Sequence, residues 1–382
     1  MSNPSSTVSR RTLVTAIGAT AAALATAPAA QAAAPTAPTP AAPAAPAAPA
    51  PAAARTVTVP ATRARSAAGR AAAGVRTDFP IHYVGISWDG PRRGGAIRLH
   101  HEETGPGAWQ PITAGCAGGP DVVGKAAVAP AAAVLVPAGG AVGYDLRLPD
   151  GAANLRSTAL DTTAGPARTA APSATAPATF CGVEYLSRAA WGADESKRFK
   201  NGVENSPAKY YPLQTLTVHH TDTPNGDADP AATVRAIYEY HAVTQDWGDI
   251  GYHFLIDEAG RIYEGRWSGD DGIPAEDANG KVVTAFHTAG FNSGNLGVAL
   301  LGTLNTQDAT PEARHSLALL LAHITRAHGL DPQAHVTFVN PVNGVTKPVD
   351  LISGHRDWLA TDCPGGTMYG TLPALRAEVA AL

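Results

Sequence analysis

Residues 213–220 read Leu-Gln-Thr-Leu-Thr-Val-His-His, and they decide the fold expected for the second half of the chain. Leu216 and Val218 are two residues apart, so on a strand their side chains share one face while His219 lies on the other. The stretch therefore predicts a buried strand that ends in a histidine pair. A histidine side chain at the end of a strand could bind a metal or take part in catalysis, or it could be a packed side chain of the core.

Strands and helices alternate on both sides of this stretch, between residues 180 and 382. Predicted strands cover residues 251–256, 261–264, 295–301 and 351–354, and predicted helices cover residues 229–241, 310–329 and 372–382. Thr310 supplies an N-cap hydroxyl and Pro311 the first position of the second helix, which Gly329 ends. Because helices interleave with strands, we expect an α/β fold in which helices cover a sheet.

The pattern differs between residues 75 and 160, where short apolar runs are broken by Gly and Pro. Such runs occur at residues 81–86, 96–99, 133–136 and 143–148. They predict a small β-rich domain, a β-sandwich or similar, of unknown role. The run His100-His101-Glu102-Glu103 could hold a metal, but adjacent side chains on a strand point to opposite faces. We therefore interpret it as a solvated edge.

The amino-terminal part of the sequence is typical of an exported protein. Arg10 and Arg11 precede a mildly apolar run at residues 13–25, and Ala30-Gln31-Ala32 fits a cleavage site. Residues 1–32 are therefore expected to be an export signal, of the twin-arginine type or an ordinary secretory signal. Residues 33–74 are rich in Ala and Pro and predict no fixed structure, and residues 161–179 predict a linker. We expect the mature protein to be secreted or associated with the cell wall.

Composition narrows the functional classes. The net charge is −4, which argues against nucleic-acid binding because such proteins usually carry a basic stripe. No apolar stretch is long enough to predict an integral membrane segment in the mature protein, and we expect a monomer. Three cysteines are too few for a disulfide scaffold. Cys116 and Cys181 could pair within the exported chain, pair between chains or remain thiols.

Two motifs near the carboxyl end suggest a metal site. His355 follows a predicted strand and Cys363 comes eight positions later, so both can reach one point if the intervening loop folds back. An imidazole and a thiolate together suit zinc, and His219 is the natural third ligand. Three protein ligands leave the fourth position open, as in catalytic zinc sites. The alternative is a buried, packed cysteine and hydrogen-bonded histidines.

At these residues the chain resembles the zinc-dependent N-acetylmuramoyl-L-alanine amidases of the amidase-2 type, a family shared with peptidoglycan recognition proteins. The matching stretches are residues 187–193, 218–221, 249–254 with 263–266, 287–292 and 353–365. They occur in the family's order and extend over residues 180–382, about half the chain. The resemblance implies a mixed central β-sheet flanked by helices, with the β-rich domain outside the match.

The resemblance also implies roles for individual residues. His219, His355 and Cys363 would bind one zinc ion, and Tyr252 would face the site and donate a hydrogen bond to a developing oxyanion. Thr361 falls where some members carry a catalytic lysine and catalytic recognition proteins carry threonine, so the resemblance implies that Thr361 is, with Tyr252, a catalytic residue. The expected muramyl-peptide groove includes His241 and His287, with Trp247, Asn292 and Asn295 as further candidates. His220 lies on the opposite face of its strand, so it is a weaker ligand candidate and is assigned to substrate binding.

The activity implied is hydrolysis of the amide bond between N-acetylmuramic acid and L-alanine in peptidoglycan. The expected cofactor is one Zn²⁺, and the expected partners are peptidoglycan and muramyl peptides. Two alternatives remain open at this point. The protein could bind peptidoglycan without cleaving it, or it could be a zinc peptidase that cuts within the stem peptide. The presence of both Cys363 and Tyr252 favours the amidase.

Overall fold

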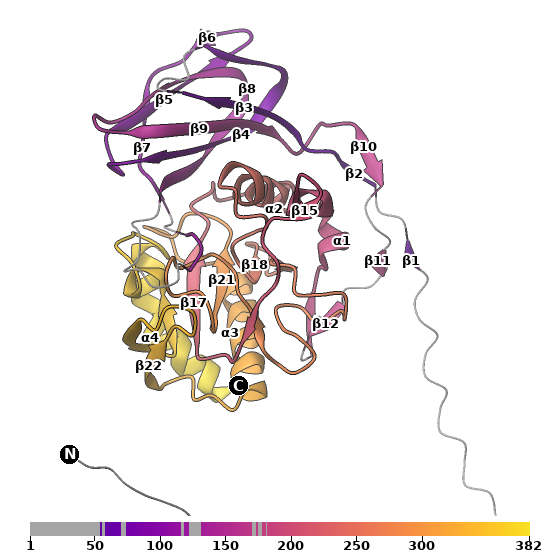
Figure 1. The fold of residues 1–382 in the computed structure, drawn as a ribbon, viewed down its shortest axis with the longest axis vertical. Coiled ribbons are helices and arrows are strands. Elements are labelled where there is room, and N and C mark those ends of the chain that lie inside the picture. Colours follow the sequence, from indigo (N-terminus) through magenta and orange to yellow (C-terminus); the bar gives the residue numbers. More distant parts are fainter. Residues whose placement is uncertain are drawn as a thin grey trace, which may run out of the picture. The chain divides into compact units, whose positions relative to one another are not determined.

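The structure is a computed structural model that describes residues 54–55, 58–69, 74–115, 118–121, 131–169, 173–174, 178–180 and 182–382 (Figure 1). The expected export signal at residues 1–32 lies outside the described residues, and so does most of the Ala/Pro-rich stretch. The prediction of no fixed structure for residues 33–74 is wrong for Arg63–Ala68, which form a strand of the β-rich sheet. Cys116 and Cys181 also lie outside them, so their pairing stays a prediction. The described helices are all too short or too polar to cross a lipid bilayer.

The described residues of the β-rich region form a seven-stranded antiparallel sheet. Its strands are β3 Arg63–Ala68, β4 Val75–Asp89, β5 Gly95–His101, β6 Gly105–Pro106, β7 Gln110–Ile112, β8 Ala132–Arg147 and β9 Ala153–Asp161. They are ordered β3-β9-β4-β8-β5-β6, and β7 also pairs with β5. Trp88, Ile97 and Tyr144 are among the fully buried side chains of its core.

This sheet differs from the expected sandwich in two ways. It is one sheet in place of two stacked ones. In addition, the two apolar runs expected as separate strands at residues 133–136 and 143–148 belong to the single strand β8. Gly139 and Gly140, with φ angles of 54° and 80°, lie between the runs and let the backbone bend without ending the strand.

The prediction of a solvated edge at residues 100–103 is wrong for His100, which is buried. Its Nε2 atom lies 2.8 Å from Asp145, and its Nδ1 atom lies 2.9 Å from Arg76. Burial alone would raise the pKa of Asp145, but hydrogen bonds from Arg98, from the Gly74 amide and from His100 lower it to about 2. Because an ion-pair network satisfies the imidazole, His100 can occupy the interior of the sheet.

The second region contains a mixed five-stranded sheet, which confirms the α/β class. The order is β19 Ile262–Glu264, β18 Phe254–Ile256, β21 Asn295–Leu300, β17 Thr215–His220 and β24 Ile352–Gly354. β17 runs parallel to both β21 and β24, and β19 is antiparallel to β18. Strand β17 is buried along its whole length, as its sequence predicts.

Helices cover both faces of this sheet (Figure 1). They are α2 Pro230–Glu239, α3 Pro311–Ala327 and α4 Gly366–Ala381. Leu216 and Val218 pack on one face with the apolar stripes of α3 and α4, and Leu255 and Ala299 pack on the other face with α2. The alternation along each strand therefore supplies two apolar cores, one on each side.

The shorter elements complete the described chain. They are β1 Ala54–Arg55, β2 Thr58–Pro60, β10 Ala167–Thr169, β11 Ser173–Ala174, β12 Ala178–Phe180, β13 Val183–Tyr185, β14 Phe199–Lys200, β15 Val203–Glu204, β16 Tyr210–Tyr211, β20 Val282–Val283, β22 His335–Val339, β23 Thr346–Asp350, α1 Arg188–Trp191, and the short helices Glu195–Arg198, Tyr240–Thr244 and His355–Asp357. The Tyr240–Thr244 segment is a π-helical turn that continues α2.

Helix α4 begins at Gly366, six residues before the predicted start at residue 372. Met368, Leu372, Leu375 and Val379 are buried at helical spacing along it. The sequence does not predict this start because Pro373 lies inside the helix and glycines occupy its first turns.

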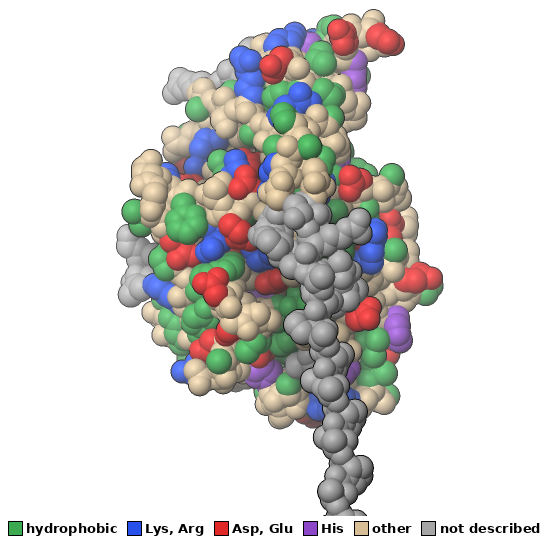
Figure 2. Space-filling model, turned by 90° about the vertical axis from the view of Figure 1, so that its right-hand side faces the viewer, with side chains coloured by type: hydrophobic (Ala, Val, Ile, Leu, Met, Phe, Trp, Pro, Cys, Tyr) green, Lys and Arg blue, Asp and Glu red, His purple; other side chains and the backbone are tan. Residues whose placement is uncertain are grey.

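On the face drawn in Figure 2, basic and acidic side chains of the described residues are interspersed.

Candidate metal centre and cleft

Three buried side chains from distant parts of the chain meet at the carboxyl ends of two neighbouring parallel strands. His219 is the penultimate residue of β17, His355 directly follows β24, and Cys363 lies in the loop before α4. The register pairs Val218 with Gly354, so the two histidines that follow are neighbours, with ring centroids 4.5 Å apart. One ligand atom from each residue lies within 4.8 Å of the others.

His355 carries the clearest sign that the cluster holds a further group. Its side chain is fully buried, and among the described residues neither ring nitrogen has a hydrogen-bond partner. A buried polar atom without a partner costs free energy, so native structures rarely leave one unsatisfied. Two imidazoles and one thiol form a donor set that suits zinc and leaves one position of a tetrahedron open. The residues present therefore fit a metal ion.

The orientation of His219 follows from its hydrogen bonds. His287 Nε2 lies 3.0 Å from the Asn295 carbonyl oxygen, which only accepts, so Nε2 carries the proton of that ring. Burial and the neighbouring His219 and His253 imidazoles lower the pKa of His287 well below its ordinary value, so the ring is neutral. His287 Nδ1 then accepts from His219 Nε2, at 2.9 Å. This leaves His219 Nδ1 as the nitrogen nearest Cys363, at 3.6 Å from Sγ.

Glycine at position 297 makes this arrangement sterically possible. A Cβ atom there would lie 2.6 Å from the His287 ring, closer than atoms can approach. The sequence interpretation assigned His287 to the groove. The structure instead places it behind His219, with both ring nitrogens engaged, although its ring still lines one end of the cleft.

The cysteine is also held by backbone groups. The His220 amide donates to Cys363 Sγ at 3.4 Å, and the Cys363 amide donates to Thr361 Oγ1 at 3.3 Å. The first bond fixes the position of the sulfur, and the second fixes the loop that carries it. His220 itself points away from the cluster, and its Nδ1 accepts from the Leu304 amide at 3.1 Å. His220 and Thr361 both line a small hollow beside Cys363.

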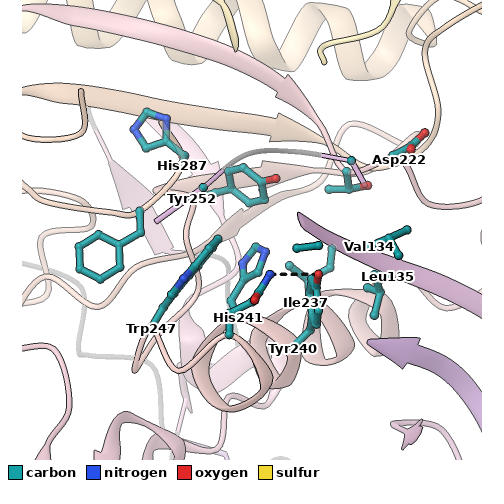
Figure 3. Close-up of a pocket in the computed structure, with 15 residues that line it drawn as sticks. Val134, Leu135, Asp222, Ile237, Tyr240, His241, Trp247, Tyr252 and His287 are labelled. Carbon is teal, nitrogen blue, oxygen red and sulfur yellow. Dashed lines mark hydrogen bonds between the residues drawn. The ribbon is translucent and has the colours of Figure 1, made fainter. Parts of the chain in front are cut away.

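A cleft beside the metal cluster is lined by neighbours of His219 and by residues of α2 and of the π-helical turn after it. Tyr252 lies between His219 and His241, with ring centroids 5.2 and 5.5 Å away. His241 packs against Trp247 at 4.7 Å and accepts a hydrogen bond from the Gly251 amide. Figure 3 shows Trp247 on one side of Tyr252 and His241. Thus Tyr252, His241 and Trp247, each predicted from sequence, line one cleft.

Asn292 is not part of this cleft, in contrast to its assignment to substrate binding. It is fully buried. Its Oδ1 accepts from the Thr288 amide, and its Nδ2 donates to Gly119 and Asp121. Asn295 is also buried, bonded to Thr217 and Thr288. These bonds occupy both amide side chains, so they brace the loop before β21.

Sequence reasoning missed the residues on the opposite side of the cleft. Val134 and Leu135 of β8 lie there, across from Trp247 in Figure 3, and the β-rich region also contributes Gly115, Ala133 and, next to Trp247, Gly118 to the lining. These residues have small or apolar side chains without reactive groups, so no motif marks them. Their role depends on the packing of the β-rich sheet, which a sequence pattern does not reveal.

Comparison with known proteins gives the same family as the motifs. The family model of N-acetylmuramoyl-L-alanine amidases matches residues 209–366. Human N-acetylmuramoyl-L-alanine amidase is 32% identical over 168 residues, which are 42% of this chain and 24% of that protein. Peptidoglycan-recognition protein SC2 of Drosophila melanogaster is 30% identical over 195 residues, which are 50% of this chain and 85% of that protein.

Solved structures give similar coverage. Drosophila peptidoglycan recognition protein LB aligns with a TM-score of 0.37 and 22% identity, over 50% of this chain and 93% of that chain. The present chain spans about a quarter of the length of the human amidase that it matches. The match to the recognition protein covers most of that relative. The chain belongs to the family of amidase-2 N-acetylmuramoyl-L-alanine amidases and peptidoglycan recognition proteins.

Proposed function

We propose that the protein is a zinc-dependent enzyme that hydrolyses the amide bond between N-acetylmuramic acid and the L-alanine of the peptidoglycan stem. The observation that carries this proposal is the buried group of His219, His355 and Cys363, in which both His355 nitrogens lack a partner among the described residues. Relatives named as amidases support the same reaction. Both lines of support concern the region from residue 180 onward.

Each group near the cluster has a role in this reaction. Zinc held by two imidazoles and a thiolate supplies a Lewis acid for the amide carbonyl and activates water at neutral pH. His219 and His355 would each offer an imidazole nitrogen, and His287 fixes the direction of His219 through Nδ1. The amides of His220 and Cys363 hold the sulfur and its loop in place.

Tyr252 is the proposed catalytic residue of the chain. Its ring lies beside His219 and is almost fully buried. Its hydroxyl would donate a hydrogen bond to the oxygen that becomes negative as the amide carbon turns tetrahedral. Thr361 has no positive charge to offer, so its proposed role is to position Cys363 through its hydroxyl. His241 and Trp247 would contact the muramyl peptide.

Peptidoglycan lies outside the membrane, and an export signal would direct the protein to the same place. We propose that residues 1–32 direct export and that residues 33–53 act as a spacer before the strands of the β-rich region. We propose further that residues 161–179 link that region to residues 180–382, the amidase domain. The exported protein would then act on peptidoglycan outside the membrane. Structures of relatives with tracheal cytotoxin, described as monomeric diaminopimelic acid-type peptidoglycan, support a muramyl peptide as ligand.

The proposal is tested by identifying the bond that is cut. Purified protein, with its zinc content measured, is incubated with a soluble N-acetylmuramoyl peptide, and the fragments are analysed by mass spectrometry. We expect free N-acetylmuramic acid and a peptide that begins with L-alanine. Fragments cut within the stem peptide would instead identify a peptidase. Intact substrate in the presence of bound zinc would identify a binding protein.

A further inference from the structure

The β-rich sheet packs directly against the helix that borders the cleft. Tyr83 and Leu160 of the sheet form one apolar cluster with Ala236 and Tyr240. Tyr83 Oη lies 3.1 Å from Thr233 Oγ1, and Tyr240 Oη donates to the Ile86 carbonyl at 3.2 Å. Buried apolar contact supported by buried hydrogen bonds is typical of a stable interface. The sheet is therefore a fixed neighbour of the cleft.

A segment of the β-rich region also crosses to the loop before β21. We name residues 118–121 the strap. The carboxylate of Asp121 accepts from the backbone amides of Asn292 and Ser293, at 3.1 and 3.0 Å. It also accepts from the side chains of the same two residues, at 2.9 and 2.8 Å. Four donors converge on one charged group, so this is a strong attachment.

The strap lies against the aromatic wall of the cleft. The Gly119 amide donates to the Phe286 carbonyl, and the Asn292 side chain donates to the Gly119 carbonyl. A Cβ atom at Gly118 would overlap both the Trp247 ring and the Phe286 carbonyl. Position 118 therefore requires glycine because the strap and Trp247 are in close contact.

Both hollows beside the metal cluster have walls from the two regions. The cleft at Tyr252 is lined by Val134 and Leu135 of β8 as well as by His241 (Figure 3). The hollow at Cys363 is lined by Thr113 and Ala114 of the β-rich region. A substrate that enters either hollow therefore lies between the amidase fold and the β-rich sheet.

We propose that the β-rich region is the second wall of the substrate cleft, that Asp121 latches it there, and that this wall selects single, uncross-linked muramyl peptides over cross-linked peptidoglycan. The identity of the substrate rests on the function proposed above. The role of Asp121 as a latch and of the β-rich region as a wall depends only on the contacts described above, and not on the proposed function. Because both hollows have walls from the two regions, a substrate that enters them lies between two fixed surfaces, and a single stem peptide needs less room there than a cross-linked network.

The latch is tested in the full protein with Asp121→Ala and, as matched control, Glu103→Ala, which removes an exposed carboxylate from the same region. A hydrogen bond to a charged group is worth roughly tenfold in an equilibrium constant. We therefore expect amide hydrogen exchange in residues 286–293 to rise by roughly tenfold or more in Asp121→Ala and to stay unchanged in the control. Unchanged exchange in Asp121→Ala would overturn the latch.

The selectivity is tested by comparing two substrates, a soluble single-stem muramyl peptide and insoluble cross-linked peptidoglycan. We expect Asp121→Ala to raise the ratio of turnover on cross-linked material to turnover on the soluble peptide, also by roughly tenfold. Gly118→Ala, which forces the strap away from Trp247, should raise the same ratio. Increased exchange with an unchanged ratio in both variants would overturn the selecting role.

The same comparison separates this proposal from the proposed function. If the wild-type protein cleaves neither substrate, the amidase proposal fails. The ratio of the affinities for the two substrates then replaces the ratio of turnover. Sedimentation with cross-linked peptidoglycan then gives one affinity, and a titration with the soluble peptide gives the other. A wild-type preference for the soluble peptide that is lost in Asp121→Ala supports the wall. Equal ratios in the two proteins would contradict it.

Discussion

Cys363 Sγ lies 3.6 Å from His219 Nδ1, although 144 residues separate the two in the sequence. Parallel pairing of β17 with β24 brings His355 to the same point. The ends of the neighbouring strands β17 and β24 and the loop before α4 thus bring three metal-ligating side chains together in a buried position. The predictions that follow test what that assembly does.

Cys363→Ser replaces the sulfur with an oxygen that remains protonated at neutral pH and binds zinc poorly. We expect zinc content to fall from about one ion per chain to a small fraction of that value, with loss of amidase activity. Far-ultraviolet circular dichroism should remain native because the side chains are similar in size. A variant that keeps its zinc and its activity would show that the sulfur is not a ligand.

His287→Ala removes the acceptor that orients His219. Partners of metal ligands typically contribute 10–100-fold to metal affinity or activity, so we expect a loss of about that size. A chelator competition assay on wild type and variant measures the affinity. His335→Ala, at an exposed histidine paired with Asp350, is the matched control and should leave the affinity unchanged. Equal affinities in all three proteins would contradict the orienting role.

Tyr252→Phe removes one hydroxyl from the cleft and leaves the ring. If that hydroxyl stabilises the oxyanion, kcat should fall about 10²–10³-fold while KM and zinc content change little. Steady-state kinetics with a soluble muramyl peptide, together with metal analysis, separate these quantities. A rise in KM alone would show that the tyrosine only binds substrate.

The β-rich sheet should lose stability in acid through Asp145. Its pKa is about 2 in the folded protein and 3.8 in a model peptide. The carboxylate therefore contributes stability above pH 3.8, and this contribution disappears as the pH falls toward 2. The shift corresponds to about 2 kcal/mol. Urea unfolding at pH 5 and pH 2.5 measures it, and in Asp145→Asn this part of the pH dependence should vanish.

The sequence was sufficient to predict the residues whose chemistry is distinctive and whose position follows from a strand end. The structure brings His219, His355 and Cys363 together, with the two histidines placed by the register of β17 and β24 and the cysteine by a loop, and their binding of a metal stays a prediction. The α/β class follows in the same way from the alternation of strands and helices. The family resemblance is confirmed by the comparisons.

Other features depend on tertiary packing, which the pattern along the chain does not contain. Asn292 has a side chain suited to binding substrate, but the strap engages its amide group. His100 was expected at a solvated edge, yet Asp145 and Arg76 allow its burial. The second wall of the cleft consists of small and apolar residues, whose importance comes only from where the β-rich sheet docks.

The central claim is that two imidazoles and one thiolate bind zinc at the end of β17 and β24. X-ray absorption spectroscopy at the zinc edge of the purified protein tests it most directly. We predict a shell with one sulfur at about 2.3 Å and nitrogen or oxygen atoms at about 2.0–2.1 Å, with the sulfur lost in Cys363→Ser. A wild-type spectrum without a sulfur scatterer would contradict the account.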